Sequence, residues 1–264
     1  MRRNIVKEKL SKGQVSIGTW ITLGHIHSTR VLAKAGFDWL TLDVEHSAYD
    51  MRETAALVAA IADSGCVPLI RPPDGSHAWI KRSLDAGAYG IVIPMVDTVE
   101  QARAAIAAAK YPPVGNRSAG GGMHNLNFDC SAEEYYQRAN DSILVILQTE
   151  SPQGIANARE IYSLPGVDAI FIGPHDLRFQ MRAPDGTFPV TAKVESHIED
   201  ALRIGREVGT PIGIHTMNAN IAEQRIEQGM SFVGVGSDLA FLCEHTRSVT
   251  DALNLEFPKD LARY

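Results

Sequence analysis

Residues 169–176 read Ala-Ile-Phe-Ile-Gly-Pro-His-Asp, an apolar run that passes directly into a glycine, a proline and two ionisable residues. Residues 90–94, Gly-Ile-Val-Ile-Pro, show the same continuous apolar character. Runs of this length are typical of strands that are buried on both faces, as they are in parallel sheets. The two stretches therefore predict a sheet with helices covering its outside.

Six further runs of this kind alternate with Ala-rich stretches of helical character. The eight predicted strands are Val15–Trp20, Phe37–Asp43, Val67–Arg71, Tyr89–Met95, Ile143–Gln148, Ala169–Gly173, Pro211–His215 and Phe232–Gly236. The helix candidates between them are Ser28–Ala35, Met51–Asp63, Ala78–Asp85, Val99–Ala109, Gln153–Tyr162, Ala192–Glu207 and Ala219–Glu227. Several predicted helices are followed by a glycine, such as Gly36 and Gly65. Glycine commonly ends a helix because it adopts the left-handed backbone conformation without steric strain.

Eight strand–helix units in 264 residues match the ~250 residues of a typical (β/α)₈ barrel. We therefore predict an α/β fold in which residues 1–264 form one domain, a single (β/α)₈ TIM barrel. An open, doubly wound sheet is the alternative that the pattern leaves open.

Two segments interrupt the alternation, Tyr111–Asn140 and Leu177–Pro189. The first contains Arg117 and the run Gly120–Gly122, and it is too long and too rich in glycine for a simple connection. It carries neither a P-loop nor a dinucleotide-binding pattern, so phosphate binding is only weakly indicated. We interpret it as a mobile loop over the functional site.

Composition narrows the class of function. A net charge of −6 argues against a non-specific nucleic-acid surface. No apolar run reaches the ~18 residues of a membrane span, and the N-terminus does not read as a signal peptide. The three cysteines lack the spacing of a disulfide framework or a zinc site. We therefore expect a cytoplasmic protein that acts on small molecules and binds neither nucleic acid nor membrane.

Polar side chains gather where the predicted strands end. The residues concerned are Trp20, Asp43, His46, Arg71, Gln148, Glu150, His175, Asp176, His215 and Asp238. The opposite ends of the strands carry far fewer such groups, with Asp168 as the main exception. Because active sites of (β/α)₈ barrels form at the C-terminal ends of the strands, this asymmetry indicates an enzyme.

Glu150 and Asp176 follow neighbouring strands. Two carboxylates in this position can share a hard divalent cation and leave positions open for water and substrate. Alternatively, they cap the helices that follow. Arg71 ends another strand, where a guanidinium suits a carboxylate or a developing enolate oxygen, although an ion pair with a loop acid is an equal alternative.

Asp43 and His46 have the spacing Asp-x-x-His directly after a buried strand. A carboxylate in this place can orient an imidazole and tune it for acid–base work. A purely structural histidine is the alternative. We interpret Trp20 as a wall of the pocket rather than a chemical participant.

Several motifs together resemble the HpcH/HpaI aldolase family, a family of metal-dependent class II pyruvate aldolases. They include Gly18-Thr19-Trp20, Asp43-Val44-Glu45-His46, Arg71-Pro72, Gln148-Thr149-Glu150 and Gly173-Pro174-His175-Asp176-Leu177. Each motif is weak alone, but their order from about Gly13 to Leu242 is specific.

The resemblance implies a role for each matching residue. Glu150 and Asp176 would bind Mg²⁺ or Mn²⁺, with Co²⁺ and Zn²⁺ as alternatives, and Arg71 would stabilise the enolate of pyruvate. His46, paired with Asp43, would serve in acid–base transfer through a metal-bound water, and an aldehyde would be the second substrate. The residues expected to contact substrate are Trp20, Arg71, Gln148, Gly173, Pro174, His175 and His215. The resemblance also implies a homohexamer, a trimer of dimers, in which the last helix (about Leu239–Leu253) packs on a neighbouring subunit.

Three features depart from the family pattern. His175 replaces a small residue, His215 replaces an apolar one, and Gly120–Gly122 stands where the family has an Arg-Ala-Ser-Arg stretch. The enolate half of the site thus looks intact, while the aldehyde half looks altered. We expect a different aldehyde partner or a related carbon–carbon lyase reaction.

Two other functions are compatible with the sequence. One is a lyase for citrate-like or acyl-CoA substrates, although no basic cluster for a nucleotide tail is evident. The other is a barrel that binds a 2-oxo acid without turnover, which the joint presence of Asp43, His46, Arg71, Glu150 and Asp176 disfavours. No lysine ends a predicted strand, so the pattern also disfavours a Schiff-base aldolase.

Overall fold

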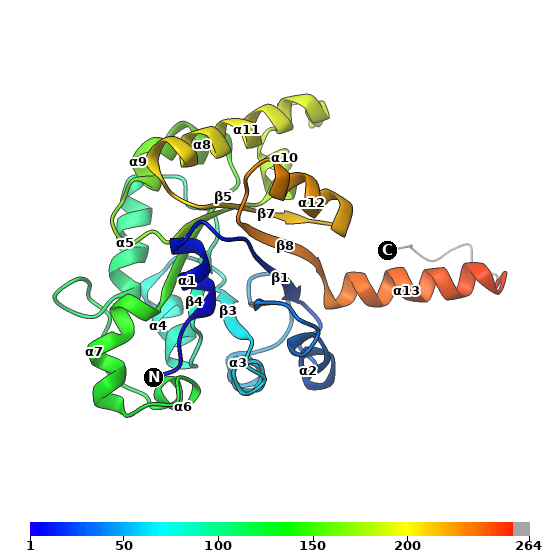
Figure 1. Cartoon of the computed structure of the whole chain (residues 1–264). Helices are drawn as coiled ribbons and strands as arrows, with labels where there is room; N and C mark the ends of the chain where they lie inside the picture. The colour runs from blue at the N-terminus through cyan, green and yellow to red at the C-terminus, as the bar shows by residue number, and fades with distance from the viewer. Residues whose placement is uncertain (256–264) are drawn as a thin grey trace.

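Eight parallel strands form a closed barrel in chain order in the computed structural model, which describes residues 1–255 (Figure 1). The strands are β1 Ser16–Ile21, β2 Trp39–Asp43, β3 Val67–Arg71, β4 Gly90–Ile93, β5 Leu144–Thr149, β6 Ala169–Ile172, β7 Ile212–Thr216 and β8 Phe232–Ser237. Strand β1 pairs with both β2 and β8, so the sheet has no free edge. The predicted TIM barrel is confirmed, and the predicted end of the domain, residues 256–264, lies outside the described residues.

Helices surround the barrel. Their bounds are α1 Ile5–Ser11, α2 Ile26–Ala33, α3 Met51–Asp63, α4 His77–Asp85, α5 Val99–Ala109, α6 Met123–Asn127, α7 Ala132–Ser142, α8 Pro152–Ala156, α9 Ala158–Tyr162, α10 Pro174–Gln180, α11 Thr191–Val208, α12 Ala219–Glu227 and α13 Asp238–Ala252. The helix predicted over residues 153–162 is two short helices that meet at Asn157. None of the helices within residues 1–255 is both long and apolar enough to cross a lipid bilayer.

Large aromatic side chains fill the barrel interior. The rings of Trp39 and Phe232 stack with centroids 4.4 Å apart, and Phe171 packs edge-on against Phe232 at 5.6 Å. Gly18 makes room for this packing, because a Cβ atom there would lie 2.0 Å from the Trp39 ring. The interior is therefore a packed core, as is usual for this fold, and open space remains only beyond it.

Helix α1 lies across the N-terminal ends of the strands. Asn4 caps this helix and also donates to the carbonyl oxygens of Tyr89 and Ser142, which precede β4 and β5. Lys7 forms an ion pair with Asp168 at 3.0 Å. This ion pair gives a structural reason for an acidic residue at this end of the barrel. The functional site is therefore expected at the opposite end.

The segment Tyr111–Asn140 does not cover the site, so its interpretation as a mobile loop there was wrong. It contains α6 and most of α7, and none of its residues lines the cavity at the barrel mouth. Arg117 anchors it instead: the guanidinium is 1% exposed, pairs with Asp85 at the end of α4 (2.7 Å) and lies over the Tyr111 ring. A buried guanidinium with a carboxylate partner fixes the segment on the outside of the barrel.

His124 is fully buried beside this anchor. Its ring lies 4.2 Å from that of Tyr135, and among residues 1–255 neither ring nitrogen has a hydrogen-bond partner. Burial lowers the pKa of His124, and the charge of Arg117 lowers it further. The imidazole is therefore neutral in the folded protein near neutral pH, at the cost of two unsatisfied polar atoms.

We predict that His124→Phe raises the free energy of unfolding by about 1–3 kcal/mol, because phenylalanine keeps the ring contact with Tyr135 and removes both unsatisfied atoms. The folded-state pKa of His124 lies below its unfolded value of about 6.5. The wild-type protein therefore binds more protons when unfolded and loses stability as the pH falls below that value. The variant should lose less.

Urea denaturation at about pH 8 and about pH 5.5 measures both effects. His197→Phe on the outside of α11 is the matched control and should change neither. A His124→Phe variant that is less stable than the wild type at both pH values would show that the buried imidazole is satisfied in solution.

Candidate active site

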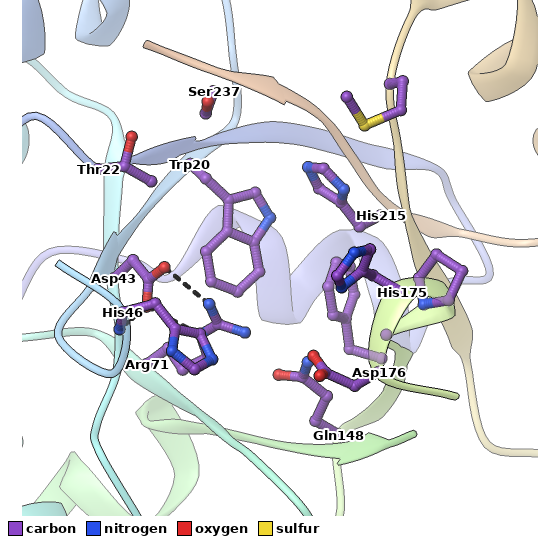
Figure 2. A pocket seen from close by; sticks show the side chains of 14 residues that line it. Trp20, Thr22, Asp43, His46, Arg71, Gln148, His175, Asp176, His215 and Ser237 are labelled. Carbon is purple, nitrogen blue, oxygen red and sulfur yellow. Dashed lines mark hydrogen bonds and ion pairs between the residues drawn. The ribbon is translucent and has the colours of Figure 1, made fainter. Parts of the chain in front are cut away.

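A cavity of about 470 Å³ opens at the C-terminal ends of the strands (Figure 2). Asp43, His46 and Arg71 lie on the left of this view, and Gln148, His175 and Asp176 on the right. Of the residues predicted from the sequence, those that line the cavity are Trp20, Asp43, His46, Arg71, Gln148, Gly173, Pro174, His175, Asp176 and His215. Thr22, Phe171, Met217 and Ser237 also line it and were not predicted.

Arg71 is held in place by acids on its own side of the mouth. The β2–β3 register places Asp43 opposite Arg71, whose Nε and Nη2 donate to the two carboxylate oxygens of Asp43 at 3.0 and 2.7 Å. Glu45 Oε2 lies 3.2 Å from Arg71 Nε, and the guanidinium lies over the Trp20 ring at 4.5 Å. The bidentate pair fixes both the position and the plane of the guanidinium.

Arg71 remains charged although its side chain is only 11% exposed. Burial opposes the charge, but the hydrogen bonds and charge of Asp43, with the charges of Glu45 and Glu150, raise the pKa of Arg71 above its usual value. The site thus keeps a permanent cationic donor at the cavity wall.

Asp43 does not orient the ring of His46, so the expected pairing of these two side chains was wrong. Asp43 Oδ1 accepts the backbone N–H of His46 at 3.2 Å, while both carboxylate oxygens bind Arg71. The nearest acid to the imidazole is Glu45, whose Oε2 lies 3.5 Å from His46 Nε2. Because the Arg71 guanidinium binds both oxygens of Asp43, that carboxylate does not bind the His46 ring. The His46 side chain is 60% exposed at the mouth.

Glu45 contacts both Arg71 and His46 and was not predicted as a site residue. It lies in the motif between Asp43 and His46, but the Asp-x-x-His spacing gives no reason to single out the acid between them. Burial raises the pKa of Glu45, and the charges of Arg71 and His46 oppose this effect.

Glu150 lies behind the cavity wall rather than on it. Its side chain is 1% exposed, and its two oxygens accept hydrogen bonds from the Met95 backbone N–H (2.8 Å) and from Gln148 Nε2 (2.5 Å). Met95 has φ = 52°, a left-handed conformation that is uncommon outside glycine. A Cβ atom on Gly173 would lie 2.2 Å from Glu150 Oε2, so a side chain there would displace the Glu150 carboxylate from its position.

The mouth carries more negative than positive charge. Burial raises the pKa of Glu150 to about 7; the Met95 N–H opposes this effect, and the charge of Asp176 adds to it. Asp43, Glu45 and Glu150 act on Arg71, and Asp176 acts on Glu45 and Glu150. Burial and the neighbouring acids raise the pKa values of Glu45 and Glu150. Ionising all four acids, with the imidazoles neutral, would leave three negative charges uncompensated, and a bound cation would offset them.

The donor set fits a hard divalent cation that keeps positions open. Glu150 and Asp176 offer carboxylate oxygens, and Gln148 Oε1 is a buried oxygen with no partner in the described part of the chain. Within residues 1–255, no group of three or more histidine, cysteine or acidic side chains is arranged to hold a metal. A cation here would therefore take two protein carboxylates and complete its coordination with water or substrate oxygens, as Mg²⁺ commonly does.

Comparison with known proteins gives one consistent picture. The family model for HpcH/HpaI aldolase/citrate lyase matches residues 16–244. The chain is 36% identical to the hydroxypyruvate/pyruvate aldolase of Pseudomonas aeruginosa over 93% of its own length and 91% of that protein. It is also 36% identical to the 2-keto-3-deoxy-L-rhamnonate aldolase of Escherichia coli, over 89% of this chain and 87% of that protein.

Solved structures agree with the sequence comparison. An HpcH/HpaI aldolase from Desulfitobacterium hafniense superposes with a TM-score of 0.86 at 31% identity, covering 97% of this chain and 98% of that one. An HpcH/HpaI aldolase/citrate lyase family protein from Burkholderia cenocepacia gives a TM-score of 0.85 at 31% identity, covering 95% and 99%.

We predict that Asp43→Leu lowers the free energy of unfolding by about 3–5 kcal/mol, because it leaves the buried Arg71 without its bidentate partner. The double variant Asp43→Leu/Arg71→Met should recover most of that loss, since it removes the unpaired charge as well. Urea denaturation of the two single variants and the double variant measures the coupling.

The exposed pair Arg203–Glu207 on α11 is the control, and Glu207→Leu should lower the free energy of unfolding far less than Asp43→Leu does. If Asp43→Leu costs no more than this control, or if the double variant is the least stable of the three, Asp43 does not hold Arg71 in the manner described.

Proposed function

The chain belongs to the HpcH/HpaI aldolase/citrate lyase family, and from this premise we propose that it is a divalent-metal-dependent aldolase acting on 4-hydroxy-2-oxo acids. It is a carbon–carbon lyase that makes or breaks the bond between the enolate of pyruvate, or of a closely related 2-oxo acid, and an aldehyde. The relatives named above are aldolases of hydroxypyruvate, pyruvate and a 2-keto-3-deoxy acid, which supports a 2-oxo acid as the enolate partner.

One observation carries the proposal: the carboxylates of Asp43, Glu45, Glu150 and Asp176 lie at the barrel mouth, where Arg71 is the one lysine or arginine among residues 1–255 that lines the cavity. Such an excess of negative charge is stabilised by a cation, and Glu150 and Asp176 are the residues that would hold it. Mg²⁺ or Mn²⁺ suits their oxygen donors best, with Co²⁺ and Zn²⁺ as alternatives. When bound, the cation supplies Lewis acidity that polarises the keto group of the substrate.

Arg71 supports the charge that develops during cleavage. In the retro-aldol direction the 4-hydroxyl group loses its proton, the bond between C3 and C4 breaks, and its electron pair passes into the enolate of the 2-oxo acid. A fixed guanidinium at the cavity wall stabilises the negative charge on the enolate oxygen through charge-assisted hydrogen bonds. Asp43 acts through Arg71, because it holds the guanidinium in place.

His46 moves the protons. Its ring lies at the cavity mouth, with Glu45 as the nearest acid, where it can take the proton of the 4-hydroxyl group and deliver one to C3 of the enolate. The rings of Trp20 and Phe171 form an apolar wall that limits the access of water. Gly173 and Pro174 bring backbone close to the bound 2-oxo acid, and Gln148 and His175 complete that side of the cavity.

The dimensions of the cavity support small substrates. About 470 Å³ accommodates a short 2-oxo acid together with a small aldehyde. Among residues 1–255, no lysine lines the cavity, which fits a reaction that proceeds without an imine. Nothing in the lining favours a citrate-like or acyl-CoA substrate or binding without turnover.

Helix α13 supports the proposal of a homohexamer, a trimer of dimers. It projects away from the barrel in Figure 1 and exposes Leu242, Val249 and Leu253 at 58%, 44% and 64%. Apolar side chains in a row on a projecting helix are expected to be covered by another subunit. The three cysteines are free in the structure, which fits the proposed cytoplasmic location.

We predict that Glu150→Gln and His46→Gln separate two steps. Glu150→Gln should lose Mn²⁺ binding and with it the metal-dependent exchange of the pyruvate methyl protons in D₂O, because it removes a carboxylate ligand. His46→Gln should keep Mn²⁺ binding but slow the exchange by ~10²–10⁴-fold, because proton transfer loses its positioned base. Calorimetry with Mn²⁺ and proton NMR are the two measurements.

Glu160→Gln on the exposed face of α9 is the matched control and should change neither measurement. Undiminished Mn²⁺ binding by Glu150→Gln would remove Glu150 from the metal site. An unchanged exchange rate in His46→Gln would remove His46 from the mechanism.

A further inference from the structure

The part of the cavity away from the carboxylates has few free polar groups. Thr22 Oγ1 donates to Asp238 Oδ1 at 3.0 Å, and Ser237 Oγ accepts the backbone N–H of Ala240 as the N-cap of α13. The Thr22 hydroxyl is therefore engaged with the Asp238 side chain, and the Ser237 oxygen with the first turn of α13. A third polar side chain in this region, that of His215, comes from strand β7.

The ring of His215 has a defined orientation. Its Nε2 lies 3.1 Å from the carbonyl oxygen of Gly236, and its ring meets Trp20 edge-on at 6.1 Å, as Figure 2 shows beside the cavity. A carbonyl oxygen can only accept a hydrogen bond, so Nε2 carries the proton. The neutral ring then presents an unprotonated Nδ1 that can only accept.

The surroundings of His215 favour this neutral tautomer. Burial lowers its pKa and the charge of Arg71 lowers it further, while the bond to Gly236 and the charge of Asp43 oppose the shift. Within residues 1–255, no group donates to Nδ1. The half-buried imidazole therefore has one nitrogen fixed by the backbone, and the other can accept a hydrogen bond from a bound substrate.

We propose that His215 Nδ1 accepts a hydrogen bond from a substrate hydroxyl group and thereby makes the enzyme prefer hydroxylated substrates. The inference rests on the proposed aldolase function. In the condensation direction, the carbonyl and carboxylate groups of the 2-oxo acid and the aldehyde are acceptors only, so an additional hydroxyl group is the one donor that these two partners carry. It can belong to C3 of the 2-oxo acid or to the carbon next to the aldehyde group.

Four substrate pairs distinguish the two sources. Pyruvate or hydroxypyruvate is combined with acetaldehyde or glycolaldehyde, and kcat/KM is measured with Mg²⁺ for each pair. The variants are His215→Leu, which has no acceptor, His215→Gln, which retains only the donor toward Gly236, and His215→Asn, which places an amide oxygen near the position of Nδ1. His197→Leu on α11 is the matched control.

The wild-type protein should prefer one hydroxylated partner, and that preference should fall about tenfold in His215→Leu and His215→Gln, the loss expected for one hydrogen bond. His215→Asn should retain most of it. A loss confined to the hydroxypyruvate pairs assigns the hydroxyl group to the 2-oxo acid, and a loss confined to the glycolaldehyde pairs assigns it to the aldehyde.

An equal change for all four pairs, or no change in any, would overturn the inference. Exchange of the pyruvate methyl protons in D₂O with Mg²⁺ is followed in parallel, because it needs no aldehyde. Exchange without a hydroxyl preference would refute only the role of His215. Absence of exchange in the wild-type protein would refute the proposed function, and this inference with it.

Discussion

A buried guanidinium at the barrel mouth is the constraint on which the site depends. Arg71 can remain charged and nearly inaccessible to water only because Asp43 binds it at two points and Glu45 approaches from the same side. Glu150 and Asp176 add two more acids across the cavity. The acids that secure one cation thus outnumber it, and this imbalance is the physical reason for proposing a second, divalent cation.

The fold confines this chemistry to one end of the barrel. Helix α1 closes the other end through Asn4 and Lys7, and the stacked rings of Trp39 and Phe232 fill the interior. Gly18 makes room for the Trp39 ring, and Gly173 leaves the Glu150 carboxylate in place. Inside the barrel of residues 1–255, open space therefore lies at the C-terminal ends of the strands, and there the ionisable groups of several strands meet.

Much of this arrangement could be predicted from the sequence, because burial on both faces gives strands a continuous apolar run and the polar residue that follows marks the mouth. What escaped prediction depends on contacts between distant residues. Arg117 fixes the segment 111–140 through an ion pair with Asp85 on another helix. The local sequence around either residue does not predict this pair. The partner of Asp43 was misjudged for the same reason, since its neighbour across the sheet, Arg71, outcompetes its neighbour in sequence, His46.

The most direct test of the central claim is anomalous diffraction from crystals grown with Mn²⁺ and pyruvate. The account predicts one strong manganese peak bound by the carboxylates of both Glu150 and Asp176, with the keto oxygen of pyruvate on the ion and within hydrogen-bond distance of Arg71. A manganese ion that binds only one of these two carboxylates, or that lies elsewhere on the protein, would contradict it.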